Sequence, residues 1–129
     1  MSYYFSKTIE AEFDKATELV IEALKVEGFG ILTEINPQQV FKEKLNIDFK
    51  KYKILGACNP AIAHRALQHE DKIGTMLPCN VIVQEVSKNK TEIAAINPVA
   101  SMLAVKNENI TKIANEVKEK LERVISSLK

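Results

Sequence analysis

Two short segments of the sequence combine cysteine, asparagine and proline, and they hold the only two thiols of the chain. The first is Gly56-Ala57-Cys58-Asn59-Pro60 and the second is Leu77-Pro78-Cys79-Asn80. Each cysteine is followed by an asparagine and has a proline within two positions. Thiols act as nucleophiles, form disulfides and bind soft metal ions. The repeated residue types therefore predict one shared site.

Cys58 precedes a typical helix start. Asn59 is a favoured N-cap residue, and Pro60 fits the first helical position. The free amide groups and the positive end of that helix would stabilise a thiolate at Cys58. His64 lies about one and a half turns into the same helix, so the spacing permits a contact with Cys58 without requiring one.

Three interpretations of these segments remain open. In the first, Cys58 is a nucleophilic or redox thiol and Cys79 is its resolving partner. In the second, Cys58, Cys79 and His64 bind a soft metal ion, although their spacing matches no dense zinc motif such as paired C-x-x-C. In the third, both cysteines are small packed residues, and Asn59 and Asn80 satisfy backbone groups at caps and turns.

The remaining sequence carries no established catalytic motif. It contains no H-E-x-x-H or Walker motif and no Ser-His-Asp order, and its acidic residues lie mostly on solvated helix faces. The glycines of Gly28-Phe29-Gly30 run from a predicted helix into a predicted strand, whereas a dinucleotide fingerprint runs from strand to helix. Asn97-Pro98 and Met102-Leu103 would form either a lid over the cysteine site or part of the core.

Composition restricts the class of protein. The 129 residues predict one domain, with 46% hydrophobic and 27% charged residues. Lys plus Arg number 18 and Asp plus Glu 17, so there is no basic surplus for nonspecific nucleic-acid binding. No apolar run approaches the roughly 18 residues of a membrane span. The N-terminus lacks the layout of a signal peptide, so we expect a cytoplasmic protein with reduced thiols.

Hydrophobic periodicity predicts alternating strands and helices. Strands are expected over residues 3–9, 29–35, 52–58, 80–86 and 91–96, and helices over 12–27, 37–45, 60–69 and from about 107 to the C-terminus. This order, with its hairpin, predicts a single α+β domain: a mixed, mostly antiparallel sheet with helices packed on one face. If the other face is left half apolar, a second copy of the chain would cover it, which predicts a homodimer.

The densest motifs resemble the domain-of-unknown-function 302 family. The resemblance rests on Ile54-Leu55-Gly56-Ala57-Cys58-Asn59-Pro60, then Ala63-His64-Arg65-Ala66-Leu67, Leu77-Pro78-Cys79-Asn80 and Asn97-Pro98. One departure is Asn97, where the family is expected to carry aspartate. The resemblance implies a small prokaryotic α+β protein, homodimeric, and it implies no reaction. The motif positions that match the family are Cys58, Asn59, Pro60, His64, Pro78, Cys79 and Asn80.

The sequence thus predicts a cytoplasmic protein that binds a small molecule or a metal ion at a two-cysteine rim. The candidate ligand-binding residues are Cys58, Asn59, His64, Cys79 and Asn80, and the candidate metal ligands are Cys58, His64 and Cys79. The cofactor is unknown, and neither nucleic acid nor membrane is expected as a partner. One alternative is a thiol-dependent enzyme with Cys58 as nucleophile, and another is a structural dimer module.

Overall fold

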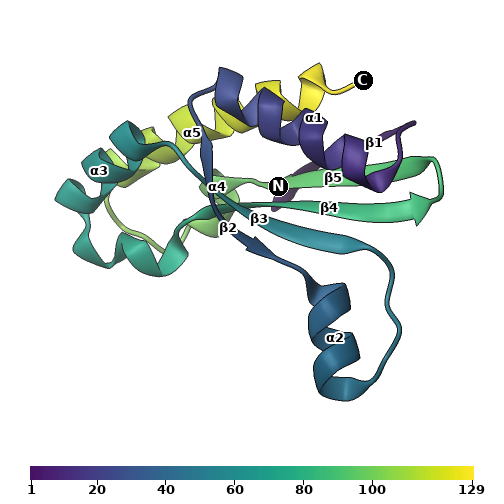
Figure 1. Cartoon of the computed structure of the whole chain (residues 1–129). Coiled ribbons are helices and arrows are strands. Elements are labelled where there is room, and N and C mark those ends of the chain that lie inside the picture. The colour runs from purple at the N-terminus through teal and green to yellow at the C-terminus, as the bar shows by residue number, and fades with distance from the viewer.

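A computed structural model describes all 129 residues. The fold is built on a five-stranded sheet (Figure 1). The strands lie in the order β1-β5-β4-β3-β2, and every neighbouring pair is antiparallel. The predicted α+β fold is confirmed, and the sheet contains no parallel pair. The strands are β1 (Tyr4–Ile9), β2 (Gly30–Ile35), β3 (Tyr52–Cys58), β4 (Cys79–Ser87) and β5 (Lys90–Ile96).

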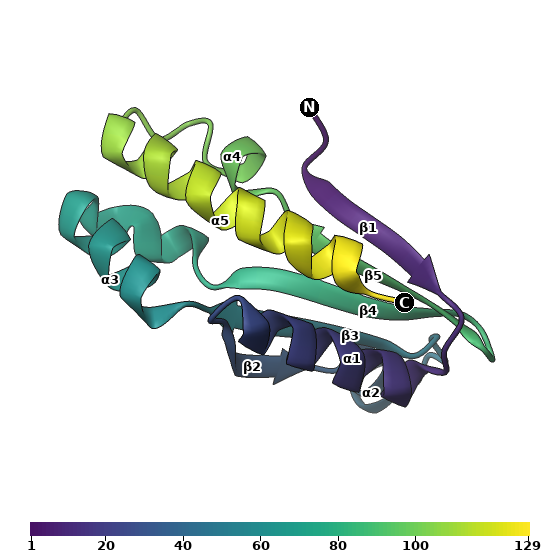
Figure 2. The ribbon, with the colours of Figure 1, turned by 90° about the horizontal axis from the view of Figure 1, so that it is seen from above.

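Two long helices cover one face of this sheet. They are α1 (Phe13–Val26) and α5 (Glu108–Ser127), and both lie over the sheet, running roughly along its strands (Figure 2). The helix α3 (Pro60–His69) packs beside α5 beyond the ends of the strands, followed by the 3₁₀ helix η1 (Asp71–Met76). The short helix α4 (Pro98–Ser101) connects β5 to α5.

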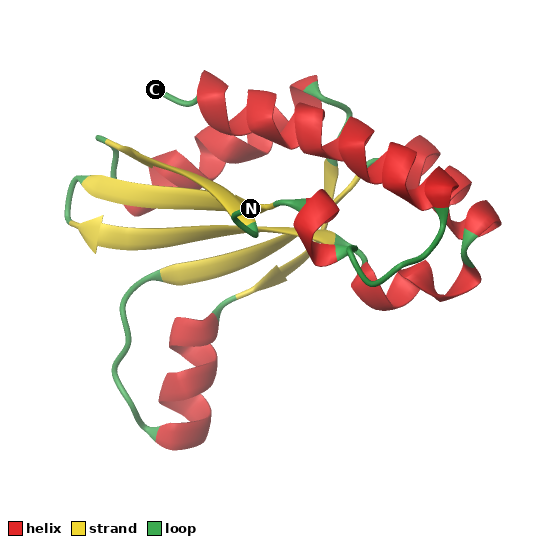
Figure 3. Ribbon diagram, turned by 180° about the vertical axis from the view of Figure 1, so that it is seen from behind, coloured by secondary structure: helices red, strands yellow, loops and turns green.

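The helix α2 (Pro37–Leu45) stands apart from the other helices. It extends from the opposite side of the sheet (Figure 3) and contains no buried residue. Phe49 connects it to the sheet, because its ring lies edge-on to Phe41 of α2 and near Tyr52 of β3. The prediction of helices packed on one face therefore holds for α1 and α5, which cover the core, and does not hold for α2.

The core lies between that pair of helices and the inner face of the sheet. Alternate strand residues point inward, and the apolar stripe of each helix meets them. The central members are Val20 and Leu24 of α1, Leu55 of β3, Val81 and Val83 of β4, Ile93 of β5, and Leu121 and Val124 of α5. No helix is long and apolar enough to cross a membrane.

Three helices begin with the same Asn-Pro pair. The side chains of Asn36, Asn59 and Asn97 accept hydrogen bonds from backbone amides in the first turns of α2, α3 and α4. In each case proline occupies the first helical position, where its missing N–H costs nothing. The pair is therefore a helix start, and it does not by itself indicate a ligand site.

Candidate functional site

The two cysteines lie at the same end of neighbouring strands. Cys58 is the last residue of β3 and Cys79 is the first of β4. Because the strands are antiparallel, the end of one meets the start of the other, and Ala57 pairs with Cys79. Both thiols are free. The structure thus brings the two cysteine segments together, as the sequence suggested.

A cavity of about 360 Å³ lies at this edge of the sheet. Its walls come from β2, from the ends of β3 and β4, from α3 and η1, from α4 with the turn after it, and from the N-terminal half of α5. Of its 20 lining residues, 16 are hydrophobic, so the cavity is an apolar extension of the core. The lining includes Leu32, Cys58, Asn59, Ala66, Leu67 and Cys79.

Exposed lining residues mark the opening of the cavity beside β2 and α3, and Gly74 of η1 is exposed there as well. Among its lining residues, Leu32 of β2 is 66% exposed and Leu67 of α3 is 44% exposed. Leu32 lies at a register shift between Ile31 and Thr33, where it has no partner on β3. Such a bulge re-aims the side chain at a strand edge. The mouth is therefore flanked by two large apolar side chains.

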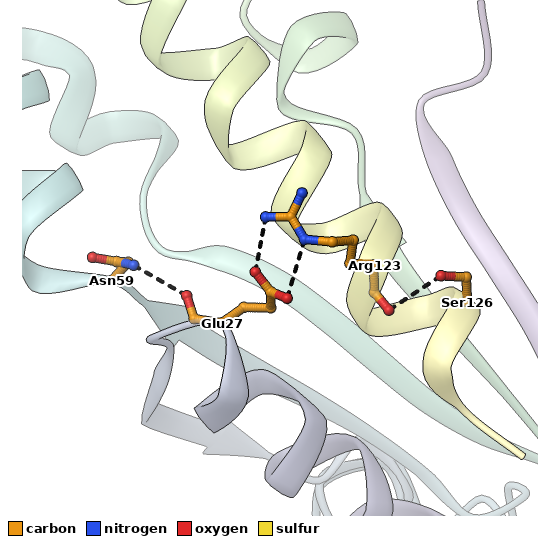
Figure 4. Close-up of polar contacts among 4 residues, drawn as sticks. All are labelled: Glu27, Asn59, Arg123 and Ser126. Carbon is orange, nitrogen blue, oxygen red and sulfur yellow. Dashed lines mark hydrogen bonds and ion pairs between the residues drawn. The ribbon is translucent and has the colours of Figure 1, made fainter.

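Asn59 is the one lining residue with an amide, and both of its polar atoms are engaged. Its Nδ2 donates to the backbone oxygen of Glu27 at 3.3 Å (Figure 4). Its Oδ1 accepts from the amide of Ile62 at 3.4 Å. Asn59 thus fastens the start of α3 to the end of α1. The structure assigns it a positioning role at the cavity wall.

The chain at Gly28 leaves room for this contact. Gly28 has φ of +87°, and a Cβ there would lie 2.8 Å from Nδ2 of Asn59. The neighbouring Glu27 accepts two hydrogen bonds from Arg123 of α5, at 2.9 and 3.1 Å (Figure 4). These bonds lower the pKa of the Glu27 carboxyl, against the opposing effect of desolvation. Glu27, at the end of α1, therefore contacts both the start of α3 and α5.

Gly56 is explained by a close approach of three strand ends. A Cβ at this position would lie 2.8 Å from the ring of Pro78 and would overlap the side chain of Thr33. Only glycine lets β2 and the segment before β4 approach β3 so closely. Gly56, Asn59 and Pro60 thus have structural roles within the motif.

Cys79 is a neutral thiol at physiological pH. Burial raises its pKa to about 11, and the nearby Cys58 adds to the effect, because a negative charge there would repel a second thiolate. A thiolate-dependent role at this edge would therefore belong to Cys58 alone.

His64 and Asn80 do not line this cavity. His64 is exposed on α3 and does not line the cavity, because Ile62 and Ala66 occupy the inward face of that helix. Asn80 follows Cys79 on a strand and points to the opposite face of the sheet, where it lines one hollow with Tyr52 and Ile82 and a smaller one that Cys79 also lines.

The predicted metal site is not assembled in the structure. No group of three His, Cys, Asp or Glu side chains is arranged to hold a metal ion. His64 is the missing member, because it faces solvent while Cys58 and Cys79 line the cavity. A structural zinc site takes four ligands, so the two thiols alone do not form one.

The segment after β5 contributes to the wall. Pro98 and Met102 line the cavity, whereas Leu103 is exposed. Asn97 is 2% exposed and serves the backbone: its Nδ2 donates to the oxygen of Ser2 and its Oδ1 accepts from Val99. The amide at this position therefore has a structural function that needs no acidic group.

Most of the cavity lining was not predicted from the sequence. The apolar residues of η1 and α5 that complete it are separated from the cysteines by long stretches of chain. One signal was present: small residues recur on the facing sides of two helices, at Ala63 and Ala66 of α3 and at Ala114 of α5. Small side chains on facing surfaces leave volume unfilled unless the backbones approach closely.

Comparison with known proteins identifies the family. The sequence profile of the domain of unknown function DUF302 matches residues 5–128. The chain belongs to the DUF302 family. A crystal structure of an uncharacterized conserved DUF302 protein from Bacillus stearothermophilus is similar with a TM-score of 0.91 and 25% sequence identity, over 100% of both chains. A search of curated proteins found no match. DUF302 membership confirms the resemblance and carries no reaction with it.

Proposed function

We propose that this DUF302 protein binds a small molecule in the cavity beside Cys58 and Cys79. The observation that carries the proposal is a hollow of about 360 Å³ with 16 hydrophobic residues among its 20 lining residues. Binding pockets for small molecules are concave, mostly apolar and about 300–1,000 Å³ in volume. The cavity falls within this range, and it is open at one side.

The energetic cost of leaving the cavity unfilled supports this proposal. Residual cavity volume costs about 24 cal/mol per Å³, so a fully enclosed void of 360 Å³ would cost on the order of 9 kcal/mol. That is comparable with the whole stability of a small domain, about 5–15 kcal/mol. Because the cavity opens to solvent, this figure is an upper limit. A ligand that displaces water from apolar walls recovers part of the cost.

The same walls give less support to a thiol-dependent enzyme. No lining residue is Asp, Glu, Lys, Arg or His, so no side chain in the cavity is suited to general acid or base catalysis. Cys58 would have to act as a nucleophile without a neighbouring base, and Cys79 is protonated. Binding is therefore the function that the site favours.

A second copy of the chain is the partner that we propose for the open face of the sheet. This face carries a hollow lined mainly by aromatic and aliphatic side chains, among them Tyr4, Tyr52, Ile82 and Ile96. A two-fold interface would remove them from water on both copies at once. Light scattering of the eluting protein at micromolar concentration tests this: we expect twice the chain mass, and a monomeric mass would count against it.

Titration with N-phenyl-1-naphthylamine, a neutral apolar dye that brightens on leaving water, tests the binding proposal. Ala66 is 5% exposed and lines the cavity, so Ala66→Phe places a ring inside it. We expect saturable binding to the wild type and at least a tenfold loss in this variant. Ala61→Phe is the matched control, because Ala61 is exposed on the same helix and does not line the cavity. Equal binding by both variants would refute the proposal.

A further inference from the structure

The cavity offers no charge and no free amide, hydroxyl or carboxylate to a ligand. Asn59 is its one lining side chain with an oxygen or nitrogen atom, and both of those atoms already bond to the backbone. The only other polarisable groups are the sulfurs of Cys58, Cys79 and Met102, which are weak hydrogen-bonding partners. A ligand inside the cavity therefore meets hydrocarbon and sulfur.

The protein also holds no buried polar group in reserve. No buried side-chain nitrogen or oxygen lacks a hydrogen-bond partner. A site that recognises a hydroxyl, carboxylate or phosphate has polar side chains in its lining that are aimed at that group. Such groups are also what lets a site reject an analogue that lacks the polar function. This cavity has neither property.

We infer that the ligand is a neutral, predominantly hydrocarbon molecule, such as an aliphatic chain, whose polar end stays at the mouth between Leu32 and Leu67. This inference rests on the proposed function and names its ligand class. An ionised group carried into the cavity loses its hydration and gains no partner, which is strongly unfavourable. An aliphatic chain loses only unfavourable hydration there.

The mouth is consistent with this orientation. Leu32 and Leu67 are large, apolar and exposed, so they extend the hydrocarbon surface outward to the solvent boundary. The nearby cation on α3 is already engaged, because Arg65 forms an ion pair with Glu116 of α5. A charged end held between these two apolar side chains would lose part of its hydration without gaining a countercharge from Arg65, whereas a neutral hydroxyl loses less there.

Ligands with the same eight-carbon chain test the class. We would displace N-phenyl-1-naphthylamine from the wild type at pH 7.5 with 1-octanol, octanoate and octylammonium. We expect 1-octanol to bind at least tenfold more tightly than either ion. Shortening the alcohol to 1-hexanol should weaken binding about three- to fourfold for each methylene removed, as expected for methylenes that leave water.

The outcomes separate this inference from the proposed function. If octanoate or octylammonium binds within threefold of 1-octanol, while Ala66→Phe still abolishes binding, the cavity binds ligands and the inference of a neutral class is overturned. If the dye does not bind, or Ala66→Phe binds it as the wild type does, both the function and the class are overturned. A tenfold preference for the alcohol that disappears in Ala66→Phe supports both.

Discussion

A larger side chain in the cavity wall should be tolerated, whereas a larger side chain in the core should destabilise the protein. Ala66 on α3 and Ala16 on α1 are both alanines in helices, and they are 5% and 0% exposed. Ala66 lines the cavity, whereas Ala16 is surrounded by the core between α1 and the sheet. Replacing either alanine by leucine adds the same three carbon atoms and changes the intrinsic helix propensity of the residue by the same amount. The two variants therefore differ mainly in the space that receives the new side chain.

The expected magnitudes have opposite signs. At position 66 the added carbons enter an existing hollow, and burial at about 0.8 kcal/mol per methylene sets an upper limit of about 2 kcal/mol of stabilisation. Allowing for imperfect fit, we expect Ala66→Leu to change the free energy of unfolding by between zero and about +2 kcal/mol. At position 16 no hollow exists, so overpacking should destabilise the protein by about 1–3 kcal/mol.

Urea unfolding followed by circular dichroism measures both values on the same scale. Unchanged m-values would show that the midpoints report stability rather than altered compactness. We expect the midpoint of Ala66→Leu to equal or exceed that of the wild type and that of Ala16→Leu to fall. If Ala66→Leu were destabilised as much as Ala16→Leu, position 66 would be tightly packed. The cavity would then not exist in solution.

Further predictions concern the thiols and the caps beside the cavity. In a Cys58→Ser variant, alkylation of Cys79 by iodoacetamide should be slow at pH 7.5 and rise steeply above pH 9, because its pKa in the wild type is about 11. The pKa of Cys79 is raised from 9.0 to about 11, so its contribution to stability is fully present below pH 9 and is lost as pH rises through 11. The loss in the free energy of unfolding should be up to about 3 kcal/mol. Urea unfolding at each pH should show that Cys79→Ala abolishes this pH-dependent loss. Asn59→Ala should destabilise the protein by about 1–2 kcal/mol and Asn36→Ala, at an exposed cap, by less, since only Asn59 also holds the end of α1. Gly28→Ala should cost at least about 1 kcal/mol from its positive φ, and combining it with Asn59→Ala should cost less than the sum of the two, because the 2.8 Å overlap is then removed.

Local patterns predicted the elements that position the site. Asn59 followed by Pro60 indicated the start of α3 at the correct residue, and the C-terminal helix was expected from about residue 107, where Asn107 caps α5. The cysteines were predicted to share a rim because Cys58 ends one strand and Cys79 begins another. These inferences depend on neighbouring residues, for which helix caps and strand ends carry clear signals.

Helix and strand periodicity alone would have predicted the orientation of His64 and Asn80. On α3, the spacing of Ile62 and Ala66 defines the inward face, and His64 falls between them on the outward side. On β4, alternation places Asn80 opposite Cys79. Chemical type suggested that all of these residues belong to one site, although neither His64 nor Asn80 lines the cavity beside Cys58 and Cys79.

The cavity itself could not be predicted from the sequence. Its walls combine β2, β3, β4, α3, η1, α4 and α5, which meet only after the whole chain has folded. An alanine on a helix face has the same pattern whether its neighbour approaches closely or leaves a hollow. The spacing between α3 and α5 is a property of tertiary packing, which no local pattern encodes.

A crystal structure of the protein soaked with 1-bromooctane tests the central claim most directly. The bromine scatters anomalously, so its position identifies where a neutral hydrocarbon chain binds. We predict an anomalous peak within the cavity or at its mouth between Leu32 and Leu67, with the chain lying against Ala66, and no peak there in crystals of Ala66→Phe. A peak found only on the open face of the sheet, or a cavity left without bound chain at saturating 1-bromooctane, would contradict the account.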